Sequence, residues 1–93
     1  NSHGTHVAGI IAGSGIANSH YRGVAPGASL VGVKALRYNA KGRVSTLVAA
    51  LDWIIQNKER YGINIVNLSL GTDENSNGQD SACLAVNKAV DYG

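Results

Sequence analysis

The chain has 93 residues, with 8 Lys or Arg, 6 Asp or Glu, a formal net charge of +2 and 44% hydrophobic residues. This length suits one small domain or part of a larger one, and the apolar content excludes the composition typical of a disordered chain. The weak positive charge, the single Cys and the lack of an apolar run of about 20 residues indicate no nucleic-acid partner, no disulfide framework and no membrane segment.

Small and apolar residues predict a buried first helix over residues 3–13. Gly4, Gly9 and Gly13 would each cost about 1 kcal/mol in an ordinary helix interior. We therefore expect them where this helix packs closely against its surroundings. A loop rich in Gly, Asn and Ser is expected over residues 14–27.

Two near-continuous apolar segments predict β-strands on either side of a second helix. Residues 29–36 and 63–70 have the composition of strands that are buried on both faces of a parallel sheet. Between them, Ser45 is the predicted N-cap of a helix that runs to about Arg60. Gly62 is its predicted C-terminal stop.

A third helix is predicted to begin at Asp80 or Ser81 and to end near Gly93, and polar loops are expected at residues 37–43 and 71–78. The order helix, strand, helix, strand, helix predicts an α/β fold whose two strands are parallel. Two strands alone do not make a stable sheet of this kind, so we expect further strands from outside this chain.

Two histidines stand three residues apart in the sequence His3-Gly4-Thr5-His6. The zinc pattern H-E-x-x-H spaces its histidines four apart and places a Glu between them, so we expect no metal ligand here. Two alternatives remain open from the residues alone. Both side chains could only hydrogen-bond locally, or one could act as a general base, because imidazole titrates near neutrality.

Three other motifs are weaker. Residues 13–18 come close to the dinucleotide fingerprint, but they lack its third Gly and follow a helix, so a flexible loop is expected. Residues 67–71 (N-L-S-L-G) come close to G-x-S-x-G, but no helix follows directly, so Ser69 is not expected to be a nucleophile. Cys83, among apolar residues of the third helix, is expected to be an inert thiol.

Residues 1–10 (N-S-H-G-T-H-V-A-G-I) resemble the histidine signature of the subtilases, the subtilisin-like serine proteases. Residues 23–28 (G-V-A-P-G-A), followed by V-K-A-L at 33–36, resemble the next block of that family. Residues 65–71 (I-V-N-L-S-L-G) resemble its substrate-binding strand. The resemblance implies a parallel-sheet, three-layer α/β/α sandwich, of which residues 1–93 are a part that continues beyond both ends.

The resemblance also implies a Ser-His-Asp endopeptidase that acts on proteins or peptides. It matches His3 with the catalytic His, which takes a proton from the nucleophilic Ser and delivers it to the leaving amine, and His6 with a structural position. It further implies two main-chain docking segments for an extended substrate, with an apolar pocket formed by Leu36, Val44 and Leu70. The implied substrate-binding residues are Leu36, Ala40, Lys41, Gly42, Val44, Ser69, Leu70 and Gly71. As a further hypothesis, Lys41 and Arg43 bias a nearby subsite toward acidic side chains.

The family's Asp block, nucleophilic Ser block and oxyanion Asn do not occur in residues 1–93. We therefore expect them elsewhere in a longer protein, and we expect this chain to be inactive without the remainder of the catalytic domain. No cofactor is expected in this chain. Members of the family often bind calcium, which leaves a calcium site open in the longer protein; residues 14–21 hold no cluster of carboxylates, so we assign no calcium site to this chain.

Secretion is the expected location, since most members of the family are secreted, although a single Cys is also compatible with the cytoplasm. Two other classes of protein stay open. One is a subtilase-like binding module that keeps His3 but has lost the Ser or the Asp of the triad. The other is a nucleotide-binding α/β domain, which only the loop at residues 13–18 and the order of the elements favour.

Overall fold

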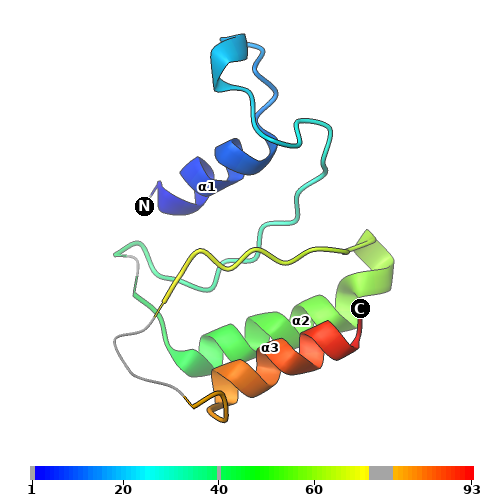
Figure 1. Cartoon of the computed structure of the whole chain (residues 1–93). Helices are drawn as coiled ribbons and strands as arrows, with labels where there is room; N and C mark the ends of the chain where they lie inside the picture. Colours follow the sequence, from blue (N-terminus) through cyan, green and yellow to red (C-terminus); the bar gives the residue numbers. More distant parts are fainter. Residues whose placement is uncertain (1, 40, 72–76) are drawn as a thin grey trace. The chain divides into compact units, whose positions relative to one another are not determined.

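The computed structural model describes residues 2–39, 41–71 and 77–93, which form three α-helices and one short 3₁₀-helix (Figure 1). The chain divides into two compact units, Asn1–Gly32 and Val33–Gly93. The first unit holds helix α1 and the 3₁₀-helix η1, and the second holds helices α2 and α3.

Helix α1 runs over His3–Ala12, so the sequence-based prediction of a helix at residues 3–13 is confirmed. Ser2 occupies the N-cap position, but its side chain makes no capping hydrogen bond. No residue of α1 is buried, and Ile10 is 56% exposed. The predicted burial of this helix is therefore wrong, because the described residues cover its apolar side chains only in part.

The C-terminal end of α1 is closed by the chain itself, which turns back after residues 14–22. Three backbone N–H groups donate to carbonyls at the end of the helix, from Gly23 to Gly13 at 2.9 Å, from Val24 to Ile10 at 3.0 Å and from Ala25 to Ile11 at 2.8 Å. The last carbonyls of a helix have no partner within it, so these bonds satisfy groups that would otherwise face water. Within the intervening loop, η1 spans Ser19–Tyr21 and is capped by the Asn18 side chain, which accepts a hydrogen bond from the N–H of His20 at 3.0 Å.

Two glycines allow this close approach of backbone to backbone. A Cβ on Gly23 would lie 2.6 Å from the N of Gly13 and 2.8 Å from the N of Ala12. A Cβ on Gly13 would lie 2.7 Å from the O of Gly9, whereas Cβ atoms on Gly4 and Gly9 would have nothing within 4 Å. Close packing was thus predicted correctly for Gly13 and wrongly for Gly4 and Gly9.

We expect Gly23→Ala to lower the free energy of unfolding by about 1–3 kcal/mol, because the new methyl group would press on backbone atoms that cannot rotate away. Urea denaturation measures the change. Gly27→Ala is the matched control, since a Cβ on Gly27 would have nothing within 4 Å and its φ lies outside the left-handed region. An equal loss of stability in both variants would contradict the close approach at Gly23.

Helix α2 covers Val44–Tyr61, near the predicted bounds. It begins before the predicted cap at Ser45, and Arg43 holds the N-cap position without a side-chain capping bond. Gly62 ends the helix as predicted. Its φ of 63° lies in the left-handed region, where Gly carries no Cβ penalty, and its N–H donates to the carbonyl of Lys58.

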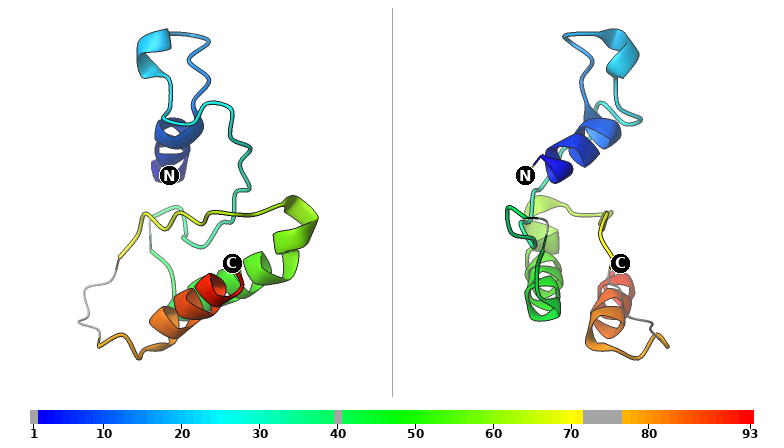
Figure 2. Two further views of the ribbon diagram at one scale, coloured as in Figure 1. Left: turned by 45° about the vertical axis from the view of Figure 1, so that its right-hand side comes forward. Right: turned by 90° about the vertical axis from the view of Figure 1, so that its left-hand side faces the viewer.

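Helix α3 covers Ser81–Asp91. The Asp80 side chain caps it by accepting a hydrogen bond from the N–H of Cys83 at 3.0 Å, so the first of the two predicted caps is confirmed. Helices α2 and α3 pack side by side (Figure 2). On the surface, Lys88 Nζ lies 3.5 Å from Asp52 Oδ1 and joins the two helices.

The core of the second unit is small. Among the described residues, the buried hydrophobic side chains are Leu51 of α2, at 1% exposure, and Ala85 of α3, at 7%. Beside them lies a cavity of about 190 Å³, lined by α2, α3 and the extended segment that follows α2. Many of the large apolar side chains predicted to be internal are exposed or only half-buried, with Leu68 and Leu70 each 38% exposed.

The predicted α/β fold with its parallel-sheet, three-layer α/β/α sandwich is wrong for this structure, because the described residues form helices and no β-strand. Residues 29–36 and 63–70 are drawn as plain coil in Figure 1. A strand requires a ladder of hydrogen bonds to a neighbour. Within the described ranges, no backbone hydrogen bond joins these two segments. The apolar pattern alone therefore does not ensure that they pair as strands.

Candidate active site

His3 is the first residue of α1 and lies exposed to solvent. The first turn of α1 is anchored by the N–H of His6, which donates to the carbonyl of Ser2 at 3.0 Å. His3 and His6 therefore lie on neighbouring positions of one helical face, as three-residue spacing requires. A side chain held on regular helix has a better defined position than one on a loop, and the exposure of His3 leaves it accessible to a reaction partner.

The loop between residues 37 and 41 is closed by its own backbone. The N–H of Arg37 donates to the carbonyl of Lys41 at 2.7 Å, and the N–H of Lys41 donates to Asn39 Oδ1 at 3.1 Å. These bonds turn the chain back on itself. Ala40, one of the predicted substrate-binding residues, lies outside the described residues.

Gly42 lies directly against the segment that enters this loop. A Cβ at Gly42 would lie 2.8 Å from the O of Ala35 and 2.8 Å from Cδ2 of Leu36. Only a residue without a side chain fits there without a shift of its neighbours. The structure thus brings together Leu36 and Gly42, two of the predicted substrate-binding residues.

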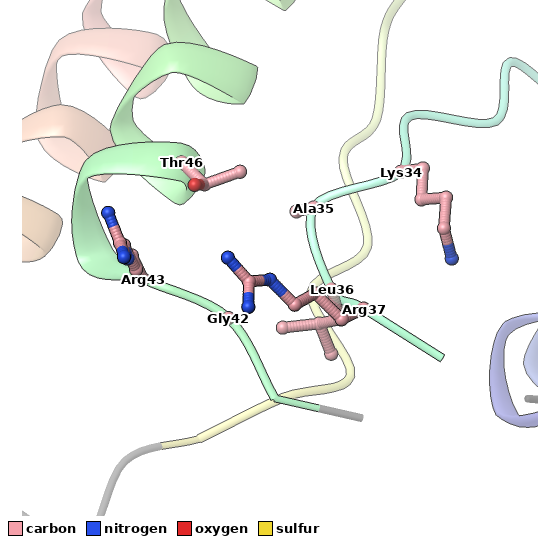
Figure 3. Close-up of a pocket in the computed structure, with 7 residues that line it drawn as sticks. All are labelled: Lys34, Ala35, Leu36, Arg37, Gly42, Arg43 and Thr46. Atoms are coloured by element: carbon pink, nitrogen blue, oxygen red, sulfur yellow. The ribbon is translucent and has the colours of Figure 1, made fainter. Parts of the chain in front are cut away.

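A pocket of about 240 Å³ opens between this segment and the start of α2 (Figure 3). Its described lining residues are Lys34, Ala35, Leu36, Arg37, Gly42, Arg43 and Thr46. Leu36 and Gly42 were predicted to bind substrate, whereas Lys41, Val44 and Leu70, also predicted, are not among these described lining residues. The pocket is therefore more basic than the apolar pocket that the sequence suggested.

Sequence reasoning named Arg43 as a basic neighbour of a subsite but missed Arg37. A signal was present, because Lys34, Arg37, Lys41 and Arg43 fall within ten residues, and no Asp or Glu occurs in residues 1–51. The placement of Arg37 and Arg43 on one pocket could not be predicted from the sequence, because it depends on the backbone hydrogen bond between Arg37 and Lys41.

Ser69, Leu70 and Gly71 lie in the extended segment after α2, and all three are exposed. The Asn67 side chain donates from Nδ2 to Ser69 Oγ at 2.9 Å. A Cβ at Gly71 would have nothing within 4 Å, so no described residue fills the space beside it. These residues and the basic pocket belong to the second unit, and His3 belongs to the first.

Metal binding has little support in the described residues. No group of three or more His, Cys, Asp or Glu side chains lies close enough together there to hold an ion. The donor set of residues 14–21 does not fit Ca²⁺, which prefers carboxylate oxygens, because this loop contains no Asp or Glu. As for membranes, none of the described helices combines the length and the apolar character that a span requires.

Comparison with known proteins supports one family. The model of the Subtilase family matches residues 1–93. The Minor extracellular protease Epr of Bacillus subtilis is 44% identical over 97 residues, covering 100% of this chain and 13% of that protein. The Serine protease AprX of the same species is 43% identical over 77 residues, covering 78% of this chain and 17% of that protein.

A third relative is Subtilisin DY of Bacillus licheniformis, 37% identical over 93 residues, which cover 100% of this chain and 31% of that protein. The chain thus spans less than a third of the length of each of these three relatives. The match to the family model extends over the histidine block, the basic pocket and the extended segment after α2.

Proposed function

This chain belongs to the subtilase family, and from that premise we propose that it supplies the histidine and part of the substrate cleft of a serine endopeptidase. The observation that carries the proposal is the match of the family to the whole chain, including His3-Gly4-Thr5-His6 at the start of α1. The three relatives compared above are named as proteases or as a subtilisin, which supports peptide-bond hydrolysis as the reaction.

In this proposal His3 is the general base of a Ser-His-Asp triad. The Ser hydroxyl attacks the peptide carbonyl while His3 takes its proton. The C–N bond then breaks, and His3 delivers that proton to the leaving amine. A water molecule then attacks the acyl-enzyme while His3 takes a proton from it. The acyl group leaves as a carboxylic acid, and His3 returns the proton to the Ser oxygen.

The Asp and the nucleophilic Ser are assigned to parts of the complete protein outside residues 1–93. No Asp of this chain stands in the family's acid block, and Ser69 lies in an extended segment next to Asn67 rather than at a turn into a helix. The remainder of the catalytic domain is then needed for activity. It also offers cover for the apolar side chains of residues 65–70, which are exposed in this chain.

We assign substrate binding to Leu36, Ala40, Lys41, Gly42, Val44, Ser69, Leu70 and Gly71. An extended peptide satisfies its backbone by pairing with exposed backbone groups, and its side chains select neighbouring pockets. The exposure of Gly71 and the pocket beside Gly42 support this role. The extracellular name of the Epr relative supports secretion.

The proposal predicts that the protein expressed from its complete reading frame hydrolyses denatured casein and short peptides. The products, identified by mass spectrometry, are new amino and carboxyl termini at internal peptide bonds. A fluorophosphonate phosphonylates an activated serine, because the Ser oxygen attacks its phosphorus and displaces fluoride, so it should abolish the hydrolysis. Hydrolysis that persists at full rate after this treatment, or no hydrolysis at all, would contradict the proposed function.

A further inference from the structure

Two arginines line one pocket, and no described Asp or Glu lines it with them. Arg37 and Arg43 both line the 240 Å³ pocket, and both are exposed. Figure 3 shows that Arg37 extends toward the start of α2, where Arg43 and Thr46 lie, whereas the Lys34 side chain points away from them. Among the described residues, the ion pairs are Lys58 with Glu59 and Lys88 with Asp52, so neither arginine of the pocket is paired.

The backbone explains why the two arginines line the same pocket. Gly42 lies against Ala35 and Leu36 because it has no side chain. Arg37 directly follows Leu36, and Arg43 directly follows Gly42, so this contact brings both arginines to the pocket. The hydrogen bond from Arg37 to Lys41, at 2.7 Å, holds the turn between them.

Two like charges beside one another raise the energy of the empty pocket, and an anion between them lowers it. A guanidinium offers planar pairs of N–H donors that match a carboxylate, and the Thr46 hydroxyl adds one more donor. Ala35 and Leu36 supply an apolar wall for the methylene groups that precede a carboxylate. The absence of Asp and Glu from residues 1–51 leaves no acidic competitor nearby in the sequence.

From this geometry we propose that the pocket formed by Arg37, Arg43 and Thr46 is an acid-selective subsite that binds the carboxylate of an Asp or Glu side chain of the substrate. The proposal rests on the proposed peptidase function for its substrate, and it deepens that function by naming a substrate class. It differs from the sequence-based hypothesis, since it places Arg37 in the subsite and leaves Lys41 out of it.

The test uses the complete protein and two matched peptide series. In one series a single Asp is moved through the positions on both sides of the cleaved bond, and in the other an Asn takes its place. We expect one position at which kcat/KM for Asp exceeds that for Asn by about tenfold, the size expected for two exposed charge-assisted contacts. Raising the ionic strength from 0.05 to 0.5 M should reduce this preference, because exposed charges are screened.

The variants Arg37→Gln and Arg43→Gln should each reduce the Asp preference to about threefold, and the double variant should abolish it. Arg37→Lys and Arg43→Lys keep the charge and should retain part of the preference. Arg60→Gln is the control for the loss of a positive charge, since Arg60 lies at the far end of α2, about 25 Å from Arg43 along the helix. It should leave the preference unchanged.

Equal kcat/KM for Asp and Asn at every position in the unmodified protein would overturn the subsite, and this comparison needs no variant to fold. A preference that survives in the double variant would overturn it as well. If no peptide is hydrolysed, the proposed function fails, and fluorescence anisotropy of labelled Asp and Asn peptides then decides the subsite separately. Tighter binding of the Asp peptides that the double variant loses would support it, and equal binding would overturn it.

Discussion

Replacing His3 with Ala in the complete protein is expected to lower kcat for peptide hydrolysis by about 10⁴-fold or more, a size set by triads of this type in related proteases. Without the imidazole, no group takes the proton from the nucleophilic Ser, so the attack on the carbonyl becomes slow. KM should change little, because the substrate-binding residues proposed here lie on other segments. Initial rates over a range of peptide concentrations separate the two constants.

His20→Ala is the matched control for this experiment. His20 is also exposed, and the hydrogen bond that involves it, at 3.0 Å, uses its backbone N–H rather than its ring. Its kcat should stay within about twofold of the unmodified protein, as expected for a surface substitution away from the chemistry. The melting temperatures of both variants check that each stays folded at the assay temperature. If His3→Ala kept most of the activity, His3 would not be the base.

Replacing Leu51 with Ala is expected to lower the free energy of unfolding by about 2–5 kcal/mol. Leu51 is 1% exposed and lies beside the 190 Å³ cavity between α2 and α3, so its truncation enlarges an existing void. The side chain loses its transfer free energy, and the helices cannot close over a space that is already incompletely filled. Urea denaturation followed by circular dichroism measures the loss.

Leu84→Ala makes the same chemical change on the surface of α3. Leu84 is 56% exposed, so its truncation removes little buried area, and we expect a change of less than about 1 kcal/mol. A loss in Leu51→Ala no greater than the loss in Leu84→Ala would show that the contact between α2 and α3 does not stabilise the protein.

The helices were predictable because their signals are local. Gly62 stops α2 through a left-handed φ that other residues rarely adopt, and Asp80 caps α3 with its own side chain. The N-cap of α2 was misplaced by two residues, since Ser45 is a better cap by composition than Arg43, yet Arg43 holds the position. No side-chain hydrogen bond caps the N-terminus of α2, so no residue type in the sequence marks where the helix begins.

The sheet was not predictable in the same way, because a strand depends on a partner far away in sequence. The apolar residues of 29–36 and 63–70 favour burial, but they do not specify which segment covers or pairs with them. In this structure both segments are extended without a ladder, and side chains such as Ile65, at 88% exposure, stay open to solvent. The burial of α1 was predicted wrongly for the same reason.

The candidate site was predictable where a motif carries it. His3 could be singled out from its block, and Gly42 from the resemblance of its segment. Arg37 could not, because its place in the pocket depends on the turn to Lys41 and on the contact of Gly42 with Leu36. The residues that make these contacts do not form a recognisable sequence motif.

In the proposed mechanism His3 activates a serine elsewhere in the complete protein. Mass spectrometry of the intact protein after treatment with a fluorophosphonate tests this role most directly. The unmodified protein should gain the mass of one adduct, mapped by digestion to a Ser outside residues 1–93, and His3→Ala should gain none in the same time. An adduct on Ser69, equal labelling of His3→Ala, or no labelling of the unmodified protein would contradict the claim.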